Sequence, residues 1–436
     1  MTNNYQSGVL DSSAAARLAL PETVSVALED IAADMGEGLL ALAVGAGLQV
    51  MQQLMEADVA AVCGPKGQHN SVRQAVRHGS EAGSVTLGGR RVPVRRPRMR
   101  TADGTAELPV PSYELFSSTE ILGRMAMHKM LAGISTRRYP VGLEPVGQRV
   151  ERAATATSKS AISRRLVAAT QTALSQLLAA PLGELDLVAL MIDGVHFGEH
   201  LCVVALGIGI DGTKHPLALV EGSTENTTTV TELLVGLRER GLDTTRPIFV
   251  GIDGAKALRA AVLRVFDHPV IGRCQLHKIR NVADKLPNHL AAMVTKRMRT
   301  AYHADSALAA QAQLEALACE LDRTHPGAAA SLREGMAETL TVLRLDVPLT
   351  LARTLRSTNS IESMISIART HCRNVKHWQN GQMALRWCAA GMAEAGKQFR
   401  RVNGHLHLPA LRQALTRHVA TDKVSTTRHN EPVIAA

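Results

Sequence analysis

The sequence predicts an α/β domain built on a mixed five-stranded sheet, with an all-helical insertion and mostly helical regions before it. Between residues 186 and 287, short apolar runs alternate with turn signals and helical segments in the order β-β-β-α-β-α-β-α. Residues 288–345 and 359–399 carry a helical texture instead. Three strands joined by tight turns, followed by alternating helices and strands, indicate a sheet with antiparallel and parallel parts.

Charge and composition limit the class of partner. The chain has 436 residues, and 49 Lys and Arg against 39 Asp and Glu give a net charge of +10. Hydrophobic residues make up 45%, which excludes wholesale disorder, whereas the 3% of aromatic residues disfavours broad base-stacking surfaces. The basic excess points to a polyanion, either nucleic acid or an anionic membrane.

The N-terminus and the cysteines indicate a compartment. No basic start followed by an apolar run marks a secretory signal. The most apolar stretch, Leu39 to Val50, has about a dozen residues, too few to span a bilayer, and is predicted to be a buried helix. The six Cys residues are scattered, with no Cys-x-x-Cys pair. We therefore expect a cytoplasmic protein whose partner is nucleic acid rather than a membrane.

The first hundred residues are predicted to form helices followed by a basic hairpin. Apolar residues recur at helical spacing through residues 20–62, and Gly88-Gly89 predicts a hairpin within residues 84–100. Pro residues among the following arginines prevent a helix, so that the arginine donors would be free for phosphates; a solvated basic loop is the alternative. The candidate DNA contacts in this hairpin are Arg90, Arg91, Arg95, Arg96 and Arg98.

Residues 117–170 are predicted to be a second helical region. One helix follows Ser117-Ser118, a break falls at Pro140, and another helix starts near Ser158. The short polar and basic side chains of that start resemble the recognition helix of a helix-turn-helix, which binds DNA. An ordinary amphipathic helix with a basic outer face is the alternative. The candidate DNA contacts are Arg137, Arg138, Lys159, Arg164 and Arg165.

Two apolar strand runs end in an acid followed by glycine, at Asp193 and at Asp253. An acid in that place lies at the carboxyl edge of the sheet, where ligands bind. If the two strands are neighbours, both carboxylates converge, and converging oxygen ligands suit Mg²⁺. An Asp-Gly pair that only starts a turn is the alternative, and Asp211-Gly212 is predicted to be such a turn.

A third acid is found at the start of a later helix. Thr358, Asn359 or Ser360 could cap this helix, with Glu362 in its first turn. A glutamate there can serve only to stabilise the helix end, which is the alternative interpretation. Arg369 lies two turns further along the same face, where it could reach the same polyanion.

Together these segments resemble the mutator-type transposases of bacterial insertion sequences. The matching pieces are Asp193-Gly194-Val195, Asp253-Gly254-Ala255-Lys256, residues 273–281 (RCQLHKIRN) and residues 357–363 (STNSIES). The spacings of 60 residues between the two aspartates and 109 residues to the glutamate also fit, because the second gap holds a helical insertion in this family. The resemblance covers about residues 80–410.

The resemblance implies an RNase H-like catalytic domain with an Asp-Asp-Glu triad. Asp193, Asp253 and Glu362 would bind two Mg²⁺ ions, or Mn²⁺ in their place, for DNA strand cleavage and strand transfer. The implied partners are double-stranded DNA, as terminal inverted repeats and as target, and a second copy of the chain, because two DNA ends have to be paired. Further candidate phosphate contacts are Lys256, Lys278, Arg369 and Arg373.

Cys274 and His277 lie three residues apart and could form half of a zinc site, but no second pair at zinc spacing stands out. Similar family members carry the same Cys and His close to the active edge. A structural or substrate-facing role is therefore expected for Cys274 and His277, and also for Asn359.

The predicted organisation has four parts. Residues 1–110 would be a helical region with a basic hairpin that binds DNA ends, and residues 111–182 a helix-turn-helix-like region. Residues 183–400 would be the catalytic domain, with its insertion at about 286–350, and residues 401–436 a helix with a disordered tail from about residue 418. Two other functions stay open: an RNase H-like nuclease that cuts without joining strands, and a non-catalytic DNA-binding remnant of a transposase.

Overall fold

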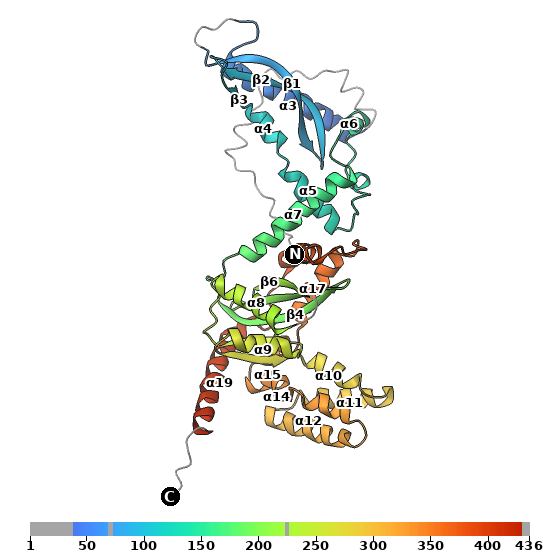
Figure 1. The fold of residues 1–436 in the computed structure, drawn as a ribbon, viewed down its shortest axis with the longest axis vertical. Helices are drawn as coiled ribbons and strands as arrows, with labels where there is room; N and C mark the ends of the chain where they lie inside the picture. The colour runs from blue at the N-terminus through green and yellow to red at the C-terminus, as the bar shows by residue number, and fades with distance from the viewer. Residues whose placement is uncertain (1–37, 69–72, 223–225, 430–436) are drawn as a thin grey trace. The chain divides into compact units, whose positions relative to one another are not determined.

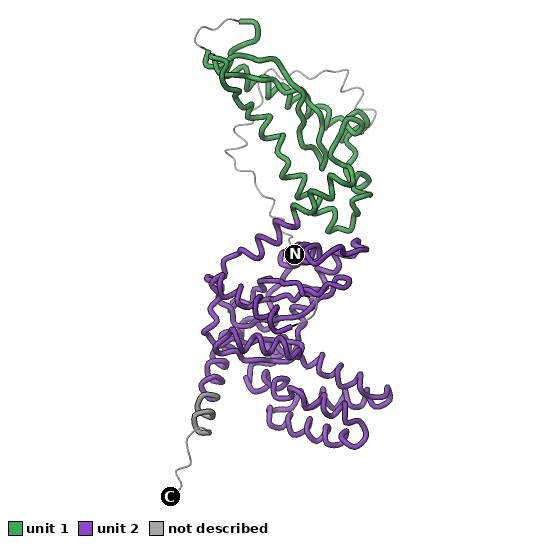
Figure 2. The backbone as a smooth tube through the Cα atoms, in the orientation of Figure 1, with its two compact units in different colours: residues 1–169 green, residues 170–436 purple. Residues whose placement is uncertain are grey.

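The computed structural model describes residues 38–68, 73–222 and 226–429. The chain divides into two compact units, residues 1–169 and residues 170–436 (Figure 2). The boundary falls within helix α7 (Lys159–Ala179). The finer predicted boundaries at residues 110 and 182 stay predictions.

The first unit contains a three-stranded antiparallel sheet in the order β1-β2-β3 and several helices (Figure 1). Before α7, its elements are α3 (Leu39–Cys63), β1 (Ala75–Leu87), β2 (Arg90–Thr101), β3 (Glu107–Leu108), α4 (Pro111–Ser117), α5 (Glu120–Leu131), the 3-10 helix η1 (Pro140–Gly142) and α6 (Gln148–Ala153). The predicted hairpin is confirmed. Gly88 and Gly89 join its strands with φ angles of 50° and 84°, the left-handed conformation that a tight two-residue hairpin turn requires.

Helix α3 ends at the predicted place but is more exposed than predicted. Met51, Met55 and Val59 recur at helical spacing on its buried face and pack with Val85 and Val92 of the hairpin. The helix has 25 residues, enough to cross a membrane by length and composition, although one such helix is weak evidence for a membrane span. The helical pattern predicted through residue 62 is confirmed from Leu39 onward, whereas only 22% of the most apolar window is buried, so the predicted burial is only partly right. The predicted helical residues 20–37 lie outside the described residues.

The two helices predicted in residues 117–170 are confirmed as α5 and α7, with the predicted break at Pro140 between them. Helix α7 begins at Lys159, next to the predicted start near Ser158. The residues between α5 and α7 form η1, the six-residue α6 and a connection over residues 154–158. A helix-turn-helix joins its two helices through a turn of about three to four residues. The geometry therefore gives the predicted helix-turn-helix no support.

The second unit is built on a five-stranded mixed sheet in the order β6-β5-β4-β7-β8. β4 to β6 are antiparallel, and β4, β7 and β8 are parallel, so the predicted mixed sheet and its β-β-β-α-β-α-β-α order are confirmed. The elements are β4 (Leu187–Phe197), β5 (His200–Gly209), β6 (Lys214–Gly222), α8 (Thr227–Glu239), β7 (Ile248–Ile252), α9 (Lys256–Val265), β8 (Pro269–Arg273) and α10 (Gln275–Ala283).

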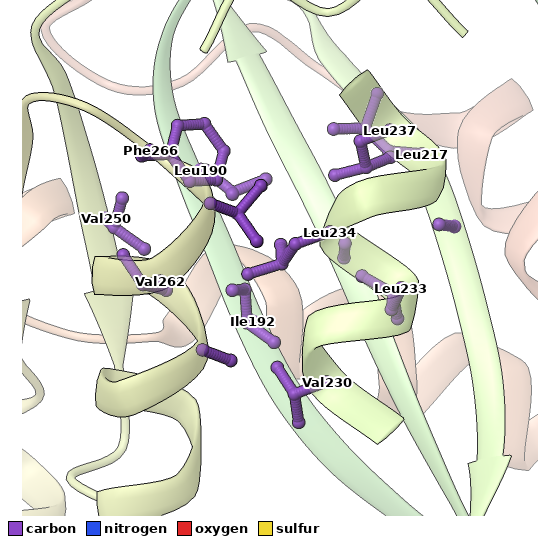
Figure 3. Close-up of a cluster of buried hydrophobic side chains, with 14 of the residues drawn as sticks. Leu190, Ile192, Leu217, Val230, Leu233, Leu234, Leu237, Val250, Val262 and Phe266 are labelled. Carbon is purple, nitrogen blue, oxygen red and sulfur yellow. The ribbon is translucent and has the colours of Figure 1, made fainter. Parts of the chain in front are cut away.

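The main apolar core explains the strand pattern. Leu190 and Ile192 of β4 and Val250 of β7 point toward Leu234 of α8 and Val262 of α9 (Figure 3). Side chains alternate along a strand, so residues 191 and 193 of β4 face the other side of the sheet. That side carries the later helices α17 (Asn359–His371), α18 (Gly381–Gln398) and α19 (Leu408–His429).

The predicted helical insertion is confirmed and has a core of its own, which includes Met298, Leu314 and Leu332. The remaining elements are α11 (Asn288–Ala301), α12 (Ala307–Asp322), α13 (Pro326–Arg333), α14 (Met336–Thr339), α15 (Thr341–Arg344), α16 (Leu349–Leu355) and the 3-10 helix η2 (His405–His407). The predicted disordered tail from residue 418 is wrong as far as residue 429. Helix α19 continues to His429. Its first turns pack against the rest of the second unit through the buried side chains of Leu411 and Leu415.

Candidate active site

Asp193 and Asp253 lie at the same level of two neighbouring strands. β4 and β7 pair in parallel with Met191 opposite Gly251, and each acid lies two residues beyond that rung, on the same face of the sheet. The predicted neighbourhood of the two strands is confirmed. The prediction that β4 ends at Asp193 is wrong, because β4 continues to Phe197 as the antiparallel partner of β5. Of the two strands, only β7 ends just before its acid, at Ile252, so only Asp253 lies at the carboxyl end of a strand.

These two carboxylates repel each other in a partly buried place. Burial, followed by the negative charge of Asp253, raises the pKa of Asp193 to about 7, although the N–H of Gly194 donates to its carboxylate at 2.9 Å. Asp253 accepts a hydrogen bond from the N–H of Ala255 at 2.8 Å. Within the described residues, neither acid forms an ion pair with Lys or Arg. A divalent cation between them would remove this repulsion.

Glu362 reaches the same edge from helix α17, which packs against β4. The helix begins at Asn359 with Glu362 in its first turn, so the predicted helix start is confirmed. The hydroxyl of Thr358 donates to Glu362 Oε1 at 2.8 Å, and His277 Nε2 lies 3.8 Å from the same oxygen. The negative charge of Glu362 contributes to the raised pKa of Asp193, so the fold brings the three predicted acids together.

Cys274 and His277 lie beside Glu362, just after strand β8. Cys274 is buried and forms hydrogen bonds with His277 and Thr358, which outweigh the effect of burial and lower the pKa of the thiol. The hydrogen bond with Cys274, assisted by the charges of the thiol, Glu362 and Asp193, raises the pKa of His277 to about 9 against the effect of burial. His277 is therefore the positive charge of the site at neutral pH.

Two sets of possible metal ligands overlap at Glu362. Asp193, Asp253 and Glu362 supply carboxylate oxygens, the donors that Mg²⁺ prefers, although among the described residues these oxygens do not all lie within 4.8 Å of one another. Potential ligand atoms of Cys274, His277 and Glu362 lie within 4.8 Å of one another and form a softer set of sulfur, nitrogen and oxygen. The sequence spacing signalled only the first two members of this softer set. The third arrives through the packing of α17, which no local pattern shows.

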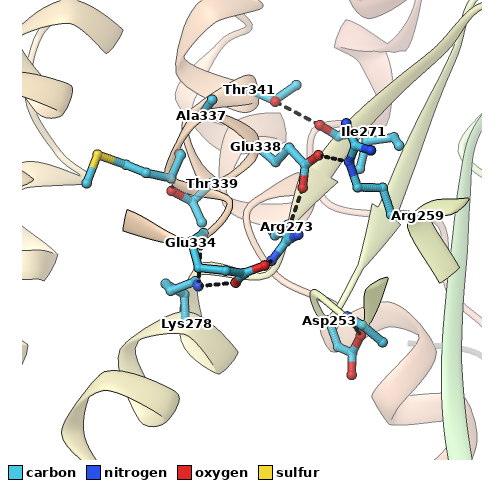
Figure 4. Close-up of polar contacts among 12 residues, drawn as sticks. Asp253, Arg259, Ile271, Arg273, Lys278, Glu334, Ala337, Glu338, Thr339 and Thr341 are labelled. Carbon is cyan, nitrogen blue, oxygen red and sulfur yellow. Dashed lines mark hydrogen bonds and ion pairs between the residues drawn. The ribbon is translucent and has the colours of Figure 1, made fainter. Parts of the chain in front are cut away.

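An ionic network centred on buried Arg273 connects the insertion to the strand next to Asp253 (Figure 4). Arg273, whose side chain is 4% exposed, donates to Glu334 at 2.7 and 2.8 Å and also to Glu338. Arg259 of α9 pairs with the same Glu338. A Cβ at Gly254, whose φ is 117°, would lie 3.2 Å from Arg273 Nη1. The network thus fixes the loop that carries Asp253, and sequence reasoning missed it because its partners are far apart in the chain.

The predicted DNA contacts of the second unit divide into two groups. Lys256, Arg369 and Arg373 are exposed, as is Asn359 at the first position of α17. Lys278 is buried instead, and its ammonium group donates to the carbonyls of Ser331 and Glu334 and to the Glu334 carboxylate. Its predicted contact with DNA is contradicted, because these partners consume its donors inside the protein.

Most arginines of the hairpin are not free, contrary to the prediction. Arg90 is 4% exposed and donates to the carbonyl of Glu144. Arg91 donates to Ser84, Thr86 and Ser117. Cross-strand pairing places acids beside Arg96 and Arg98. The ion pairs are Arg96–Glu81, Arg96–Glu107, Arg98–Glu81 and Arg98–Glu107. The sequence showed the positive charges but not the strand register that pairs them.

The remaining candidates of the first unit are more accessible. Arg95 is exposed, although it donates to the hydroxyl of Ser80 at 2.9 Å. Arg165 is half-buried and donates to the carbonyl of Ala156 at 2.7 Å. The other candidates are exposed, namely Arg137, Arg138, Lys159 and Arg164.

Comparisons with known proteins agree with the resemblance seen in the sequence. The family profile described as "Transposase, Mutator family" matches residues 24–402. The transposase for insertion sequence element ISRM5 of Rhizobium meliloti (strain 1021) is 26% identical over 398 residues, which cover 90% of this chain and 96% of that protein. The transposase for insertion sequence element IS6120 of Mycolicibacterium smegmatis is 28% identical over 242 residues, 54% of this chain and 73% of that protein.

Proposed function

The chain belongs to the mutator family of transposases, and on this premise we propose that it cleaves DNA at the ends of an insertion sequence and joins the ends to target DNA. The observation that carries the proposal is the convergence of Asp193, Asp253 and Glu362 at one edge of the sheet. The mixed sheet, its element order and its helical insertion support an RNase H-like description of this domain.

We assign a metal-binding role to the three acids. Asp193, Asp253 and Glu362 would hold two Mg²⁺ ions, or Mn²⁺ in their place, because carboxylate oxygens are the ligands that hard cations prefer. When bound, the ions supply Lewis-acid stabilisation of the charge that develops on the phosphodiester oxygens. Asp193, whose pKa is about 7, gives up its proton on metal binding, because the cation offsets the charge of Asp253. Thr358 holds the Glu362 carboxylate in place through its hydroxyl.

DNA is the proposed partner of both units. Lys256, Arg369 and Arg373 are exposed on the second unit, where they are available to phosphates. For the terminal repeats the candidates are the exposed cations of the first unit, namely Arg95, Arg137, Arg138, Lys159 and Arg164. Joining two ends in one reaction requires both to be held together, so a homodimer or larger assembly on DNA is part of the proposal.

The experiment that tests the proposal replaces Asp193 by Asn. The matched control is Asp211→Asn, an exposed Asp-Gly turn whose carboxylate accepts from Thr213. With a plasmid that carries the element's terminal repeats and Mg²⁺, we expect Asp193→Asn to bind the ends but to lose nicking, while the control nicks normally. Pre-cleaved ends with a free 3′-hydroxyl then separate a transposase, which joins them to target DNA, from a nuclease. Wild-type nicking by Asp193→Asn would overturn the proposal.

A further inference from the structure

Three adjoining hollows on the second unit are lined by cations and by no acid. Their volumes are about 370, 240 and 460 Å³. Arg353 lines the first and the second hollow, and Arg299 lines the second and the third, so the three hollows adjoin one another. We call this surface the basic groove; its cations are Lys214, Arg401, Arg353, Arg356, Arg299 and Lys296.

Among the described residues, the cations of the basic groove have no carboxylate in direct contact, although Arg401, after the hydrogen bonds from Thr213, helps to lower the pKa of Asp211. In the described part of the chain, none of the six forms an ion pair within 4.0 Å. Other arginines of the same insertion are paired, since Arg297 contacts Glu320 and Arg333 contacts Glu315. Arg356 also has a buried guanidinium nitrogen without a hydrogen-bond partner. This concentration of unpaired positive charge favours an anionic ligand, because an anion would supply the missing partners.

The walls of the basic groove are held in place by contacts between separate segments. The hydroxyl of Thr354 in α16 donates to the carbonyl of Asn403 at 2.9 Å. The N–H of Val402 donates to the carbonyl of Gly212 at 3.0 Å, which ties the loop of Arg401 to the turn before β6. Lys214 Nζ lies 4.7 Å from the centre of the Phe399 ring. These contacts join α16, the loop before η2 and the edge of the sheet, so the cations are preorganised.

The basic groove passes the helix turn that carries Glu362. Asn359, Ser360 and Ser363 from the first turns of α17 line its first hollow. Glu362 lies on the same stretch of helix and contacts Thr358 and His277. A chain of negative charges in the groove therefore lies beside the acid site.

We propose that the basic groove binds the phosphodiester backbone of the DNA that is to be cut, and leads it to the acid site. This inference rests on the proposed function and assigns six cations that the sequence did not single out. Six cations spread over three hollows match a ligand with repeated negative charges better than a single anion. Each hollow exceeds the space of several water molecules, at about 30 Å³ each, so a sugar-phosphate unit fits.

The first experiment removes one exposed cation from each of three segments of the groove, in the variant Arg299→Ala/Arg353→Ala/Arg401→Ala. The probe is a fluorescein-labelled duplex of about 30 base pairs, titrated into the full chain between about 50 and 200 mM NaCl. Each lost phosphate contact lowers the slope of log affinity against log salt by about 0.9, so we expect a decrease of roughly 2 to 3. Millimolar inorganic phosphate is added in a second arm, and we expect it not to displace the duplex from the wild type.

The matched control is Arg238→Ala/Arg264→Ala/Arg417→Ala. It removes the same charge from three exposed arginines of the same unit that lie outside the groove. We expect its salt slope to change by less than about 1. Equal slopes for the two triple variants would overturn the inference, as would displacement of the duplex by inorganic phosphate at constant ionic strength.

The second experiment locates the DNA by crosslinking. Ser360→Cys in a Cys319→Ser background places an azidophenacyl crosslinker in the first hollow, and the other five cysteines are buried. Exposed Cys319 of α12, labelled in the wild type, is the control position. We expect crosslinks to the duplex from position 360 at least tenfold above those from Cys319, and equal yields would contradict the groove. These outcomes are independent of nicking by Asp193→Asn, so failure of the groove and failure of the proposed function are distinguishable.

Discussion

Two groups of carboxylates in the second unit are built in opposite ways. Glu334 and Glu338 of the insertion face Arg273, and each has a further cation, Lys278 for the first and Arg259 for the second. Asp193 and Asp253 face each other, and no Lys or Arg of the described chain pairs with them. The first group holds the fold together, whereas the second is left with charge that the protein itself does not neutralise.

The pKa values follow this difference. Burial acts on both groups, but the hydrogen bonds from Lys278 and Arg273 outweigh it and lower the pKa of Glu334. At Asp193, burial and the charge of Asp253 act in the same direction and raise the pKa to about 7. Repulsion that a fold retains without a partner is a sign of a site that binds a cation from solution. The comparison therefore separates structural acids from candidate catalytic acids by their partners.

The largest expected effect comes from neutralising an unpaired acid. Asp253→Asn keeps the size of the side chain and can still accept from the N–H of Ala255. If Asp253 is a metal ligand, as proposed, the variant loses several kcal/mol of transition-state stabilisation, so we expect Mg²⁺-dependent nicking to fall by about 10³-fold or more.

The control for Asp253→Asn is Glu320→Gln, which neutralises an exposed acid paired with Arg297. We expect the control to nick within about twofold of wild type, because surface ion pairs contribute at most about 1 kcal/mol. Nicking by Asp253→Asn above roughly a tenth of the wild-type rate would remove this aspartate from the active site.

The next effect is on stability and comes from the paired group. Arg273→Ala leaves Glu334 and Glu338 without their shared partner in a place where the arginine side chain is 4% exposed. Each glutamate keeps its second cation, Lys278 or Arg259, so we expect a cost of about 2–3 kcal/mol, below that of leaving a buried charge with no partner. Urea unfolding of the second unit, followed by far-UV circular dichroism, measures the loss.

A second variant tests the reason for this loss. When Glu338→Gln is added to Arg273→Ala, we expect part of the stability to return, since this largely buried carboxylate no longer carries a charge; Glu334 is kept because it pairs with buried Lys278. A loss below about 1 kcal/mol in Arg273→Ala would show that the network does not fasten the insertion.

The sequence was sufficient for the sheet because its strands are buried on both sides. A run such as residues 187–192 has no amphipathic ambiguity, and the glycine-containing turns mark where strands end. The sequence also contains a signal for the rest of β4, which the prediction did not use. Val195 and Phe197 are buried while His196 between them is exposed, the alternation of a half-buried strand. The apolar run stopped at Asp193, but the strand did not.

The sequence was insufficient where the partners come from elsewhere in the chain. The ion pairs of Arg96 and Arg98 depend on the register between β1, β2 and β3, which a list of charges does not contain. The burial of Lys278 depends on Glu334 in the insertion. The three acids were found from strand ends, a helix start and a family resemblance, but the contact of Glu362 with His277 required the packing of α17.

The repulsion at Asp193 predicts a pH dependence of the metal-free protein. Its pKa of 3.8 in the unfolded chain rises to about 7 on folding, so the folded state binds more protons between these values and stability falls as the pH rises through them. Such a rise corresponds to about 4 kcal/mol at most, and partial exposure reduces this to about 2 kcal/mol. Asp193→Asn does not titrate there, so in EDTA we expect it to be more stable than wild type at pH 8 and not at pH 4.

We expect magnesium to reverse the order of stabilities in this experiment. If Asp193 is a metal ligand, as proposed, the wild type gains stability from Mg²⁺ and Asp193→Asn gains less. Thermal unfolding at pH 8 with and without Mg²⁺ measures both effects. If EDTA-treated wild type and Asp193→Asn show the same stability at pH 8, the carboxylates do not repel each other as the structure indicates.

The smallest expected effect distinguishes the two overlapping ligand sets. Cys274→Ser keeps a hydrogen-bonding group beside His277 and Thr358 but removes the thiolate that a soft metal requires. If the carboxylates are the functional set, nicking with Mg²⁺ changes less than about threefold, and the cost in stability is about 1 kcal/mol, as for an ordinary buried substitution.

The pKa of His277 shows whether Cys274 acts on the site through its hydrogen bond to His277. A merely structural role of Cys274 would leave this pKa unchanged. The hydrogen bond to Cys274 is the first cause of its rise to about 9, so the pKa should fall toward 6.5 in Cys274→Ser, as followed by NMR of the imidazole protons. Metal analysis of the purified wild type completes the test. One zinc per chain, together with loss of nicking in Cys274→Ser, would move Glu362 from the magnesium set to the softer one.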